Sequence, residues 1–452
     1  MKPLAMIPRS TSIYTLMGLL LLGYGIVRVL NLSEAVQRVK STADTTSYVR
    51  ISNERIFSSQ FVAAARPFVF PLLLKLLGGD PEKAVWAQAL FSILSWSTLA
   101  WAVASSLHFY LLKFAGFVLI LLLSLYRYII GWDSVLLTES LSLSLMALFI
   151  AGWVWLLKGW RWHKAFFVVA VGFFWVFCRD TNAWVVLMIA VFLLVLVVLR
   201  QINRNYLFLS TSFMILFLLS NLSADSGGRW IFPFQNVLGR RILPDAQAVA
   251  FFASCGMPLS PELTQLTGEF ASGLDRAFYN DPALEDFRAW LHGAGKSCYI
   301  QWLLSDPLES IRRPVAEFNT MISLENIQPF LFSRRFSPML PARLETVLYP
   351  SRQSWILFLA ACGIMLAAVF NRAWTYNKTW WVAIFLILLV FPHYFIVWHG
   401  DVMGIYRHMV SVSIQLYLGI WALTLLIADW LLSLKVIQEH RVGQVLFRGE
   451  SH

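Results

Sequence analysis

Charged residues are scarce in this chain of 452 residues, where they make up 13% of the total. A soluble globular domain carries about 25% charged residues, so a single large core does not explain the shortfall. Hydrophobic residues reach 58%, and many segments must therefore be surrounded by lipid. The composition excludes an ordinary soluble domain and indicates a polytopic integral membrane protein.

Cysteine is also rare, with only Cys178, Cys255, Cys298 and Cys362. None of the four belongs to a CxxC pair, which argues against a zinc or redox motif. Cys255 and Cys298 share one long loop, and they would form a disulfide if that loop faced an oxidising compartment. A disulfide and two free thiols are equal alternatives at this point.

Dense basic runs, nucleic-acid motifs and internal repeats are all missing from the sequence. The net charge of +11 comes from residues in short loops between apolar segments, so we predict no nucleic-acid partner. The lack of repeats disfavours a repeat-built transporter. Membrane lipids are the surroundings that the sequence predicts.

Ten apolar segments approach the length of about 20 residues that crosses a bilayer. They predict an all-α bundle of about ten transmembrane helices, of which the fifth is short. The segments are 11–30, 86–107, 112–130, 135–157, 165–178, 183–199, 206–222, 354–370, 379–397 and 408–434.

The short loops between these segments carry an asymmetric charge. With the N-terminus inside, the only acidic residues on that side are Glu439 and Glu450, both near the C-terminus. Its basic residues are Lys2, Arg9, Lys113, Lys158, Arg161, Lys164, Arg200, Arg204, Arg372, Lys378, Lys435, Arg441 and Arg448. By the positive-inside rule, both termini are cytoplasmic in a cytoplasmic (inner) membrane, and the long loops are extracytoplasmic.

The predicted spans divide the chain into four parts. The long second part has amphipathic patterns broken by Pro and Gly, which predict a small helical domain lying on the membrane surface. The parts are an N-terminal transmembrane module at 1–222 with a first outer loop at 31–85, an extracytoplasmic helical domain at 223–353, C-terminal transmembrane helices at 354–434, and a cytoplasmic tail at 435–452.

Unusual polar residues gather at the outer ends of the predicted spans. An ionisable group near the membrane is costly and usually faces a cavity or a partner. Because four separate outer turns carry such groups, we expect a shared polar site. The residues are Asp44, Tyr48, Arg66, Asp133, Thr138, Glu139, Arg179, Asp180, His393, His399, Asp401, Arg407 and His408.

Five short stretches follow one another in a characteristic order. They are ADTTSY at 43–48, RPFVFPLLL at 66–74, WAQALFS at 86–92, LTESL at 137–141 and YRH at 406–408. In this order they resemble the GT-C superfamily of membrane glycosyltransferases, which use polyprenyl-phosphate-linked sugars. The nearest likenesses are to lipid A aminoarabinose transferases and protein O-mannosyltransferases, over roughly 1–220 and 354–434.

This resemblance implies a GT-C-like bundle with a catalytic carboxylate in the first outer loop, at Asp44. We expect Asp44 to act as the general base that removes the proton of an acceptor hydroxyl. Arg66 and Arg407 would hold the leaving lipid phosphate, whose charge grows in the transition state. The expected reaction is a single displacement with inversion at the sugar carbon.

The sequence departs from the family pattern at one position. Many members carry an Asp-Glu pair in the first loop, whereas Thr45 follows Asp44 here. We therefore predict no metal site, and a divalent metal bound with the help of His399 and Asp401 stays an alternative. The expected donor is a polyprenyl-phosphate-linked sugar, and the expected acceptor is a hydroxyl on a glycolipid, a polysaccharide or a protein.

The candidates for binding the sugar or the acceptor are Tyr48, Glu139, Asp133, His399 and Asp401. Simpler interpretations compete with each functional one. Asp44 would also suit a helix cap, and Arg66 an interfacial anchor. Glu139 would also suit a structural partner for Arg66 or Arg407, and Arg179 and Asp180 would pair with each other.

Three Arg-Arg pairs occur in the long second part, at 240–241, 312–313 and 334–335. Anionic lipid headgroups attract such clusters, so docking on the outer leaflet is one interpretation. The other is that a pair, with Arg240 and Arg241 as candidates, binds the donor phosphate. A membrane-dipping edge beside that pair would be formed by Trp230, Ile231, Phe232 and Phe234.

Two other functions fit the sequence less closely. A polysaccharide polymerase or O-antigen-type ligase also has ten or more spans and a long outer loop, but it relies on Arg and His in that loop. A lipid or solute transporter or flippase predicts ionisable residues at mid-membrane depth and broken helices. The polar residues here cluster at span ends instead.

Overall fold

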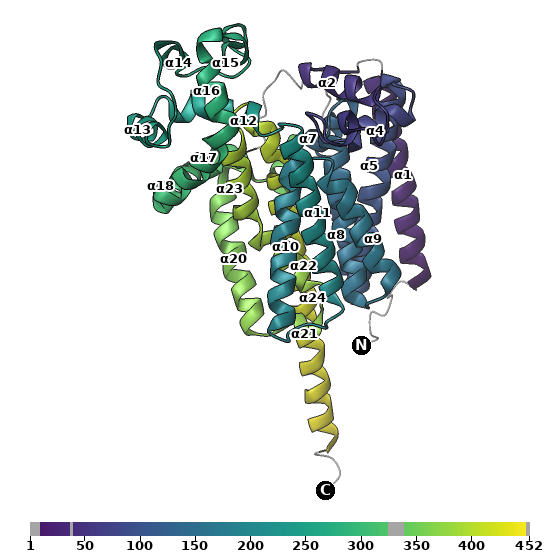
Figure 1. The fold of residues 1–452 in the computed structure, drawn as a ribbon. Coiled ribbons are helices and arrows are strands. Elements are labelled where there is room, and N and C mark those ends of the chain that lie inside the picture. Colours follow the sequence, from purple (N-terminus) through teal and green to yellow (C-terminus); the bar gives the residue numbers. More distant parts are fainter. Residues whose placement is uncertain (1–9, 37–38, 324–338, 449–452) are drawn as a thin grey trace.

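The computed structural model of the chain describes residues 10–36, 39–323 and 339–448. Helices dominate these residues, and the β-type pairing within them is an isolated bridge between Lys40 and Val135. Figure 1 shows a long helical bundle with a smaller group of helices at one end. The prediction of an all-α, multi-pass membrane protein is confirmed.

Eight helical stretches of the described residues are long and apolar enough to cross a membrane. A ninth is the pair formed by α6 (Tyr110–Ser124) and the stretch Arg127–Ser134, which is bent by 55°. The eight lie in α1 (Ser10–Val36), α5 (Pro81–Ser106), α8 (Glu139–Lys158), α10 (Asp180–Val198), α11 (Tyr206–Ser226), α19 and α20 (Ala342–Leu348, Ser354–Phe370), α22 and α23 (Trp380–Leu388, Val390–Gly400) and α24 (Ile405–Arg448).

Each of the ten predicted apolar segments contains helix, but two are not simple spans. α9 (Trp162–Val176) has 15 residues and is roughly 22 Å long, against a hydrocarbon core of about 30 Å. The third predicted segment breaks at Tyr126, whose backbone is extended before α7 (Arg127–Ile130) and the short helix Gly131–Ser134. Hydropathy does not register such a bend, because the side chains on both sides of it are apolar.

The bundle is built around α8. Inside the protein, α8 buries 83% of its apolar stretch, whereas α1 buries 17% of its own and lies at the edge. α5 packs along α8, and α10 packs along α11. We call one end of the bundle the α2 end, since it carries α2 (Ala43–Ser52), α3 (Ser59–Val62) and α4 (Val69–Leu76), and the other the α21 end, after α21 (Ala373–Tyr376) (Figure 1).

Several short helices at the α2 end surround a hydrophobic cluster of their own, which includes Phe252, Phe278 and Phe287. We call this part the α12–α17 domain. Its helices are α12 (Ile231–Val237), α13 (Ala246–Ser254), α14 (Pro261–Gln265), α15 (Ala277–Asn280), α16 (Glu285–Trp290) and α17 (Lys296–Ser305).

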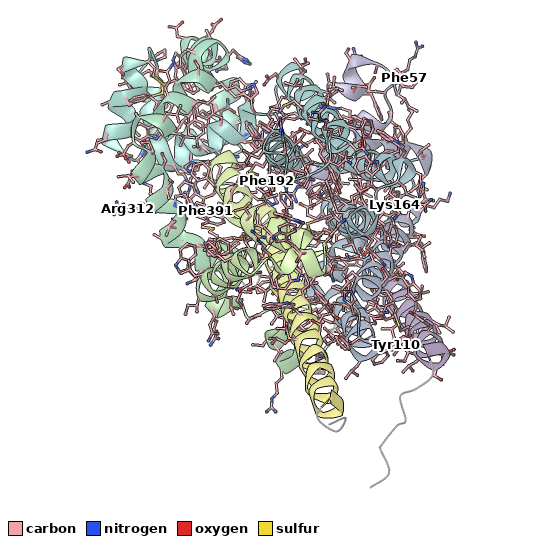
Figure 2. The ribbon with its side chains drawn as sticks, turned by 90° about the horizontal axis from the view of Figure 1, so that it is seen from below. Phe57, Tyr110, Lys164, Phe192, Arg312 and Phe391 are labelled. Carbon is pink, nitrogen blue, oxygen red and sulfur yellow. A yellow bond between two sulfur atoms is a disulfide. The ribbon has the colours of Figure 1, made fainter. Side chains whose placement is uncertain are left out.

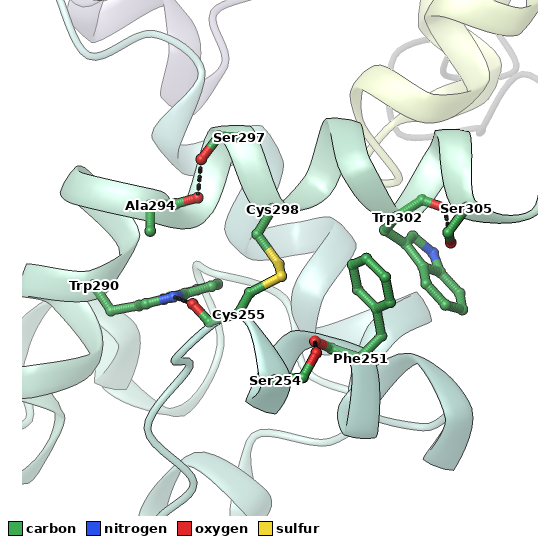
Figure 3. The surroundings of a disulfide bond; sticks show 9 residues. All are labelled: Phe251, Ser254, Cys255, Trp290, Ala294, Ser297, Cys298, Trp302 and Ser305. Atoms are coloured by element: carbon green, nitrogen blue, oxygen red, sulfur yellow. Dashed lines mark hydrogen bonds between the residues drawn. A yellow bond between two sulfur atoms is a disulfide. The ribbon is translucent and has the colours of Figure 1, made fainter.

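A disulfide joins two helices of the α12–α17 domain. Cys255, at the end of α13, is bonded to Cys298 in α17, and their Cα atoms lie 6.0 Å apart (Figure 3). Trp290 covers the bond and donates a hydrogen bond from its indole nitrogen to the carbonyl of Cys255 at 3.1 Å. Of the two alternatives left by the sequence, the structure therefore shows the disulfide.

The next helix, α18 (Pro307–Ile322), leaves this domain and runs down the side of the bundle. Its successive carbonyls accept hydrogen bonds from α23 and α24: Ser310 from His399 at 3.0 Å, Pro314 from Tyr394 at 2.8 Å, and Ile322 from Ser413 at 2.7 Å. Tyr394 and Ser413 lie progressively farther from the α2 end. α18 therefore does not lie flat above the bundle, as a surface domain would.

The last helix continues past the predicted membrane boundary. α24 runs without a break from Ile405 to Arg448 and projects beyond the α21 end (Figure 1). The predicted tail is thus helical as far as Arg448. The basic leader at residues 1–9 and the Arg pair at 334–335 lie outside the described residues.

Candidate functional site

Asp44 lies in the first turn of α2, but it is not the helix cap. Thr42 is the cap residue, and the backbone N–H of Thr42 donates to the side chain of Thr45 at 2.9 Å. The Thr45 hydroxyl donates in turn to the carbonyl of Leu136 at 3.0 Å, which ties α2 to the segment before α8. Asp44 is therefore free to use its carboxylate elsewhere.

The Asp44 carboxylate is held between two arginines. Arg66 donates to Oδ1 at 2.5 Å, and Arg407, from the start of α24, donates to Oδ2 at 2.9 Å. Burial alone would raise the pKa of Asp44, but the two guanidinium groups outweigh it and hold the pKa below its ordinary value. Because its pKa is low, the carboxylate is ionised at neutral pH. It is also 24% exposed, so a ligand can reach it.

Arg407 also contacts Glu139, at the first position of α8. Its Nε lies 3.1 Å from Oε1 of Glu139, which is 3% exposed. Arg179 approaches the same oxygen at 3.7 Å, and its guanidinium hydrogen-bonds Nδ1 of His408. In the described part of the chain, Oε2 of Glu139 has no hydrogen-bond partner and can still accept a hydrogen bond.

We call these six residues the polar cluster; they are Asp44, Arg66, Glu139, Arg179, Arg407 and His408. They come from five regions of the chain that are far apart in sequence. Its three arginines face two carboxylates, so the ion pairs leave one positive charge even with a neutral histidine. Such a cluster favours the binding of an anion.

Tyr48 packs against Arg66 of the polar cluster. The guanidinium carbon of Arg66 lies 5.7 Å from the centre of the Tyr48 ring, and Phe70 packs edge-on against the other side. Burial raises the pKa of Tyr48 to about 12, so the phenol stays neutral. Tyr48 thus orients Arg66 through its ring, a role that the sequence did not suggest.

Asp133 lies apart from the polar cluster. It is buried and receives a hydrogen bond from Arg28 of α1 at 2.5 Å and another from Ser140 at 2.5 Å. Arg28 also donates to the hydroxyls of Tyr24 and Ser92, each at 2.9 Å, and to the carbonyl of Ser124 at 3.4 Å. The pair joins α1 to the segment before α8, and it was invisible in the sequence because Arg28 looked like an ordinary end of the first span.

Arg179 and Asp180 do not pair with each other, so the simpler interpretation of these two residues is wrong. Arg179 joins the polar cluster, whereas Asp180 lies 3.1 Å from Arg229. Gly228, the residue before Arg229, has a φ of +59° and turns the chain back after α11. This turn brings Arg229 to Asp180, a contact that the sequence did not suggest. Gly227 supports the same turn, since a Cβ there would lie 2.3 Å from the carbonyl oxygen of Ala64.

His399 and Asp401 lie where the α12–α17 domain meets the bundle. Tyr299 donates to the carbonyl of His399 at 2.9 Å, and Asn236 donates to Asp401 at 3.0 Å. The other carboxylate oxygen of Asp401 lies 3.9 Å from Nε2 of His408. Asp401 therefore borders the polar cluster, while His399 is engaged by the domain.

Neither arginine of the 240–241 pair reaches the polar cluster. Arg240 donates to the carbonyl of Gly268 at 2.6 Å, inside the domain. Arg241 lies over the ring of Trp398, 3.4 Å from its centre, and donates to the Trp398 carbonyl. Both contacts hold the domain together or fix it to α23, and they leave the Asp44 region to Arg66 and Arg407.

An apolar cavity of about 90 Å³ lies between helices of the bundle, and its lining extends as far as Leu157 of α8 and Ile202 near the α21 end. Met146 of α8 and Gln415 of α24 contribute to its wall. Met146 follows Glu139 by seven positions, and Gln415 follows Arg407 by eight, so the cavity begins roughly 10 Å nearer the α21 end. α8 and α24 thus carry the charged groups of the polar cluster near the α2 end and line the apolar cavity nearer the α21 end.

We expect Asp401→Asn to stabilise the protein at about pH 8 and to have almost no effect near pH 3. Burial raises the pKa of Asp401 to about 6, although Met403 and Asn236 donate hydrogen bonds to it. The charged form therefore costs stability above that pKa, and the cost vanishes once the carboxyl is protonated in the folded and unfolded states. The gain should be about 3 kcal/mol at the higher pH.

Thermal unfolding in detergent at the two pH values tests this expectation. Asp225→Asn is the matched control, because Asp225 is half-exposed and pairs with Lys296 at 2.6 Å. An equal gain at both pH values for Asp401→Asn would show that its charge is not the cause.

No three His, Cys, Asp or Glu side chains of the described residues are arranged to hold a metal ion. No protein-family model matches this chain, and no curated protein matches it. The geometry of the polar cluster and of the cavity beneath it is therefore the basis for a proposal about function.

Proposed function

We propose that the protein is a GT-C-like glycosyltransferase, which moves a sugar from a polyprenyl-phosphate donor to an acceptor hydroxyl. In this proposal the chain crosses the membrane ten times, with α9 and the bent α6–α7 pair included. The α2 end faces away from the cytoplasm. The basic loops of the α21 end support that orientation, and so does the disulfide of the α12–α17 domain, because disulfides persist in oxidising compartments.

One observation carries the proposal: a carboxylate held by two arginines lies above an apolar cavity on shared helices. A lipid phosphate has a matching shape, with an anionic head and an apolar chain. Arginine suits the head because its planar fork binds phosphate through two hydrogen bonds. A soluble sugar donor would have no use for the cavity.

The reaction that this arrangement suits is a single displacement. The acceptor oxygen bonds to the anomeric carbon as the bond from that carbon to the phosphate oxygen breaks. The acceptor proton passes to Asp44, and the lipid phosphate leaves with its charge held by Arg66 and Arg407. Glu139 is buried, with Oε1 3.1 Å from Nε of Arg407, and is suited to hold that arginine in place.

The two arginines also explain how Asp44 would become a base at the right moment. While they bind Asp44, they keep its pKa low, and a weakly basic carboxylate removes a proton poorly. The donor phosphate competes for the same N–H groups. Its binding would draw the guanidinium charges away from Asp44 and raise the carboxyl pKa, so that the base becomes active only when the donor is in place.

The test is a transfer assay with the purified protein in lipid nanodiscs. A panel of polyprenyl-phosphate-linked sugars is supplied with a lipid and polysaccharide extract, and release of polyprenyl phosphate is measured. We expect cleavage of one donor class and a product of inverted anomeric configuration. Retention of configuration would contradict the single displacement, and transport of a donor across a vesicle membrane without cleavage would favour a flippase.

A further inference from the structure

A row of exposed apolar side chains follows α17 and α18. Ile300 and Leu304 are four residues apart on one face of α17, and Leu308 and Ile311 are three residues apart on one face of α18. Leu304 is 70% exposed and Leu308 is 81% exposed. A group of large apolar side chains exposed in this way marks a site of contact with a protein or a membrane. We call the turn between the two helices, with these four residues, the α17–α18 elbow.

The elbow lies beside the end of α23, where the α12–α17 domain meets the membrane-spanning helices. The carbonyl of Ser310 accepts a hydrogen bond from His399 near the end of α23, and Ile322 accepts one from Ser413, eight positions after the start of α24. At about 1.5 Å per residue, this places the far end of α18 roughly 12 Å inside the bundle. Figure 1 shows α18 beside α23 and below α13 to α16.

The surface next to the elbow is already lipid-facing. Phe318 of α18 packs against Trp355 and Phe358 of α20, with ring centres 4.9 and 5.7 Å apart. On the outer side of α20, Ile356 and Leu359 are exposed, as expected of a helix that contacts lipid chains. The exposed face of α18 continues that surface toward the α2 end.

The charged side chains of α18 are arranged to suit a membrane interface. Glu309 binds both Arg312 and Arg313, and Arg313 also pairs with Asp245 of the domain at 2.7 Å. Arg312 is 77% exposed and projects from the edge of the molecule (Figure 2). An arginine beside an inserted apolar face can reach anionic headgroups while the apolar residues enter the chains.

We propose that the α17–α18 elbow is a membrane-docking wedge, in which Leu304, Leu308 and Ile311 insert into the leaflet at the α2 end. The partner is the lipid surface itself, and the proposal does not depend on the glycosyltransferase assignment. It moves the docking surface away from Trp230, Phe232 and Phe234, where the sequence placed it. Those three are packed against the core of the α12–α17 domain.

Depth-dependent fluorescence quenching tests the wedge. The variant Leu308→Cys carries an environment-sensitive dye, in a background with Cys362→Ser so that the one partly exposed free thiol is removed. The matched control is Tyr279→Cys in α15, which is 39% exposed at the top of the domain in Figure 1. Both are placed in nanodiscs, where water-soluble quenchers reach both faces.

Nitroxide groups on lipid chains should quench the dye at position 308 and spare the dye at position 279. Iodide in the water should do the opposite, with a quenching constant about threefold lower at 308 than at 279. Strong quenching by iodide at 308 would place the elbow in water and overturn the proposal. Protection from both quenchers would do so as well, because it would mean that protein covers the elbow.

Discussion

Replacing Asp44 with Asn is expected to lower the rate of transfer by about 10³-fold, since a positioned general base contributes about 10² to 10⁴. Asn keeps the size of the side chain and can still accept a hydrogen bond from Arg66 or Arg407. It cannot take the acceptor proton at neutral pH. The loss should therefore appear in kcat, while the donor binds at least as well, because the arginines no longer have a competing carboxylate.

The measurement is a steady-state assay of donor cleavage together with donor binding to the same preparation. Asp225→Asn is the control, because its carboxylate pairs with Lys296 outside the polar cluster and both side chains are about half-exposed. Turnover by Asp44→Asn at the level of that control would remove Asp44 from the mechanism. A donor affinity that fell together with kcat would instead make Asp44 a structural partner of the arginines.

Replacing Arg407 with Lys is expected to weaken donor binding about tenfold and to slow transfer as well. Arg407 contacts Asp44 through Nη1 and Glu139 through Nε, at 2.9 and 3.1 Å. A lysine ammonium keeps the charge but cannot span both carboxylates with a planar fork. Arg407→Gln should be worse, because it leaves the buried Glu139 with Arg179 alone and costs stability of about 3 kcal/mol.

Two further lysine variants separate charge from geometry. Arg66→Lys should have a smaller effect on stability, since Arg66 is more exposed and has one carboxylate partner, at 2.5 Å. Arg312→Lys is the neutral control, because Arg312 pairs with Glu309 and does not contact the polar cluster. If Arg407→Lys bound the donor as well as Arg312→Lys does, the phosphate would have to be held elsewhere.

The sequence was sufficient for the helical membrane fold and for gathering the charged residues at span ends. Both conclusions depend on local properties, namely the length of apolar runs and the sign of charge in loops. The partners of those charges depend instead on how the helices are rotated about their axes. Arg179 and Asp180 illustrate the limit: they are adjacent in the chain, yet they point to Glu139 and to Arg229 on different sides of α10.

Helix rotation, which the sequence does not reveal, also explains why we predicted more residues for the site than the structure brings together there. Asp133 lies seven positions before Ser140, which it contacts, but its charge is neutralised by Arg28, 105 residues earlier. Arg240 and Arg241 were candidates because they are adjacent, and the contacts that occupy them come from Gly268 and Trp398. No local pattern marks either partner.

The buried pair of Arg28 and Asp133 has a consequence for the synthesis and membrane insertion of the protein. α1 is made first, and Arg28 then belongs to an apolar stretch whose partner has not yet been synthesised. Until α5 and the segment at 131–134 arrive, the arginine can reach charge and water only by extending toward the headgroups. We therefore expect α1 to reach its final position only after α5 and the segment at 131–134 have been inserted.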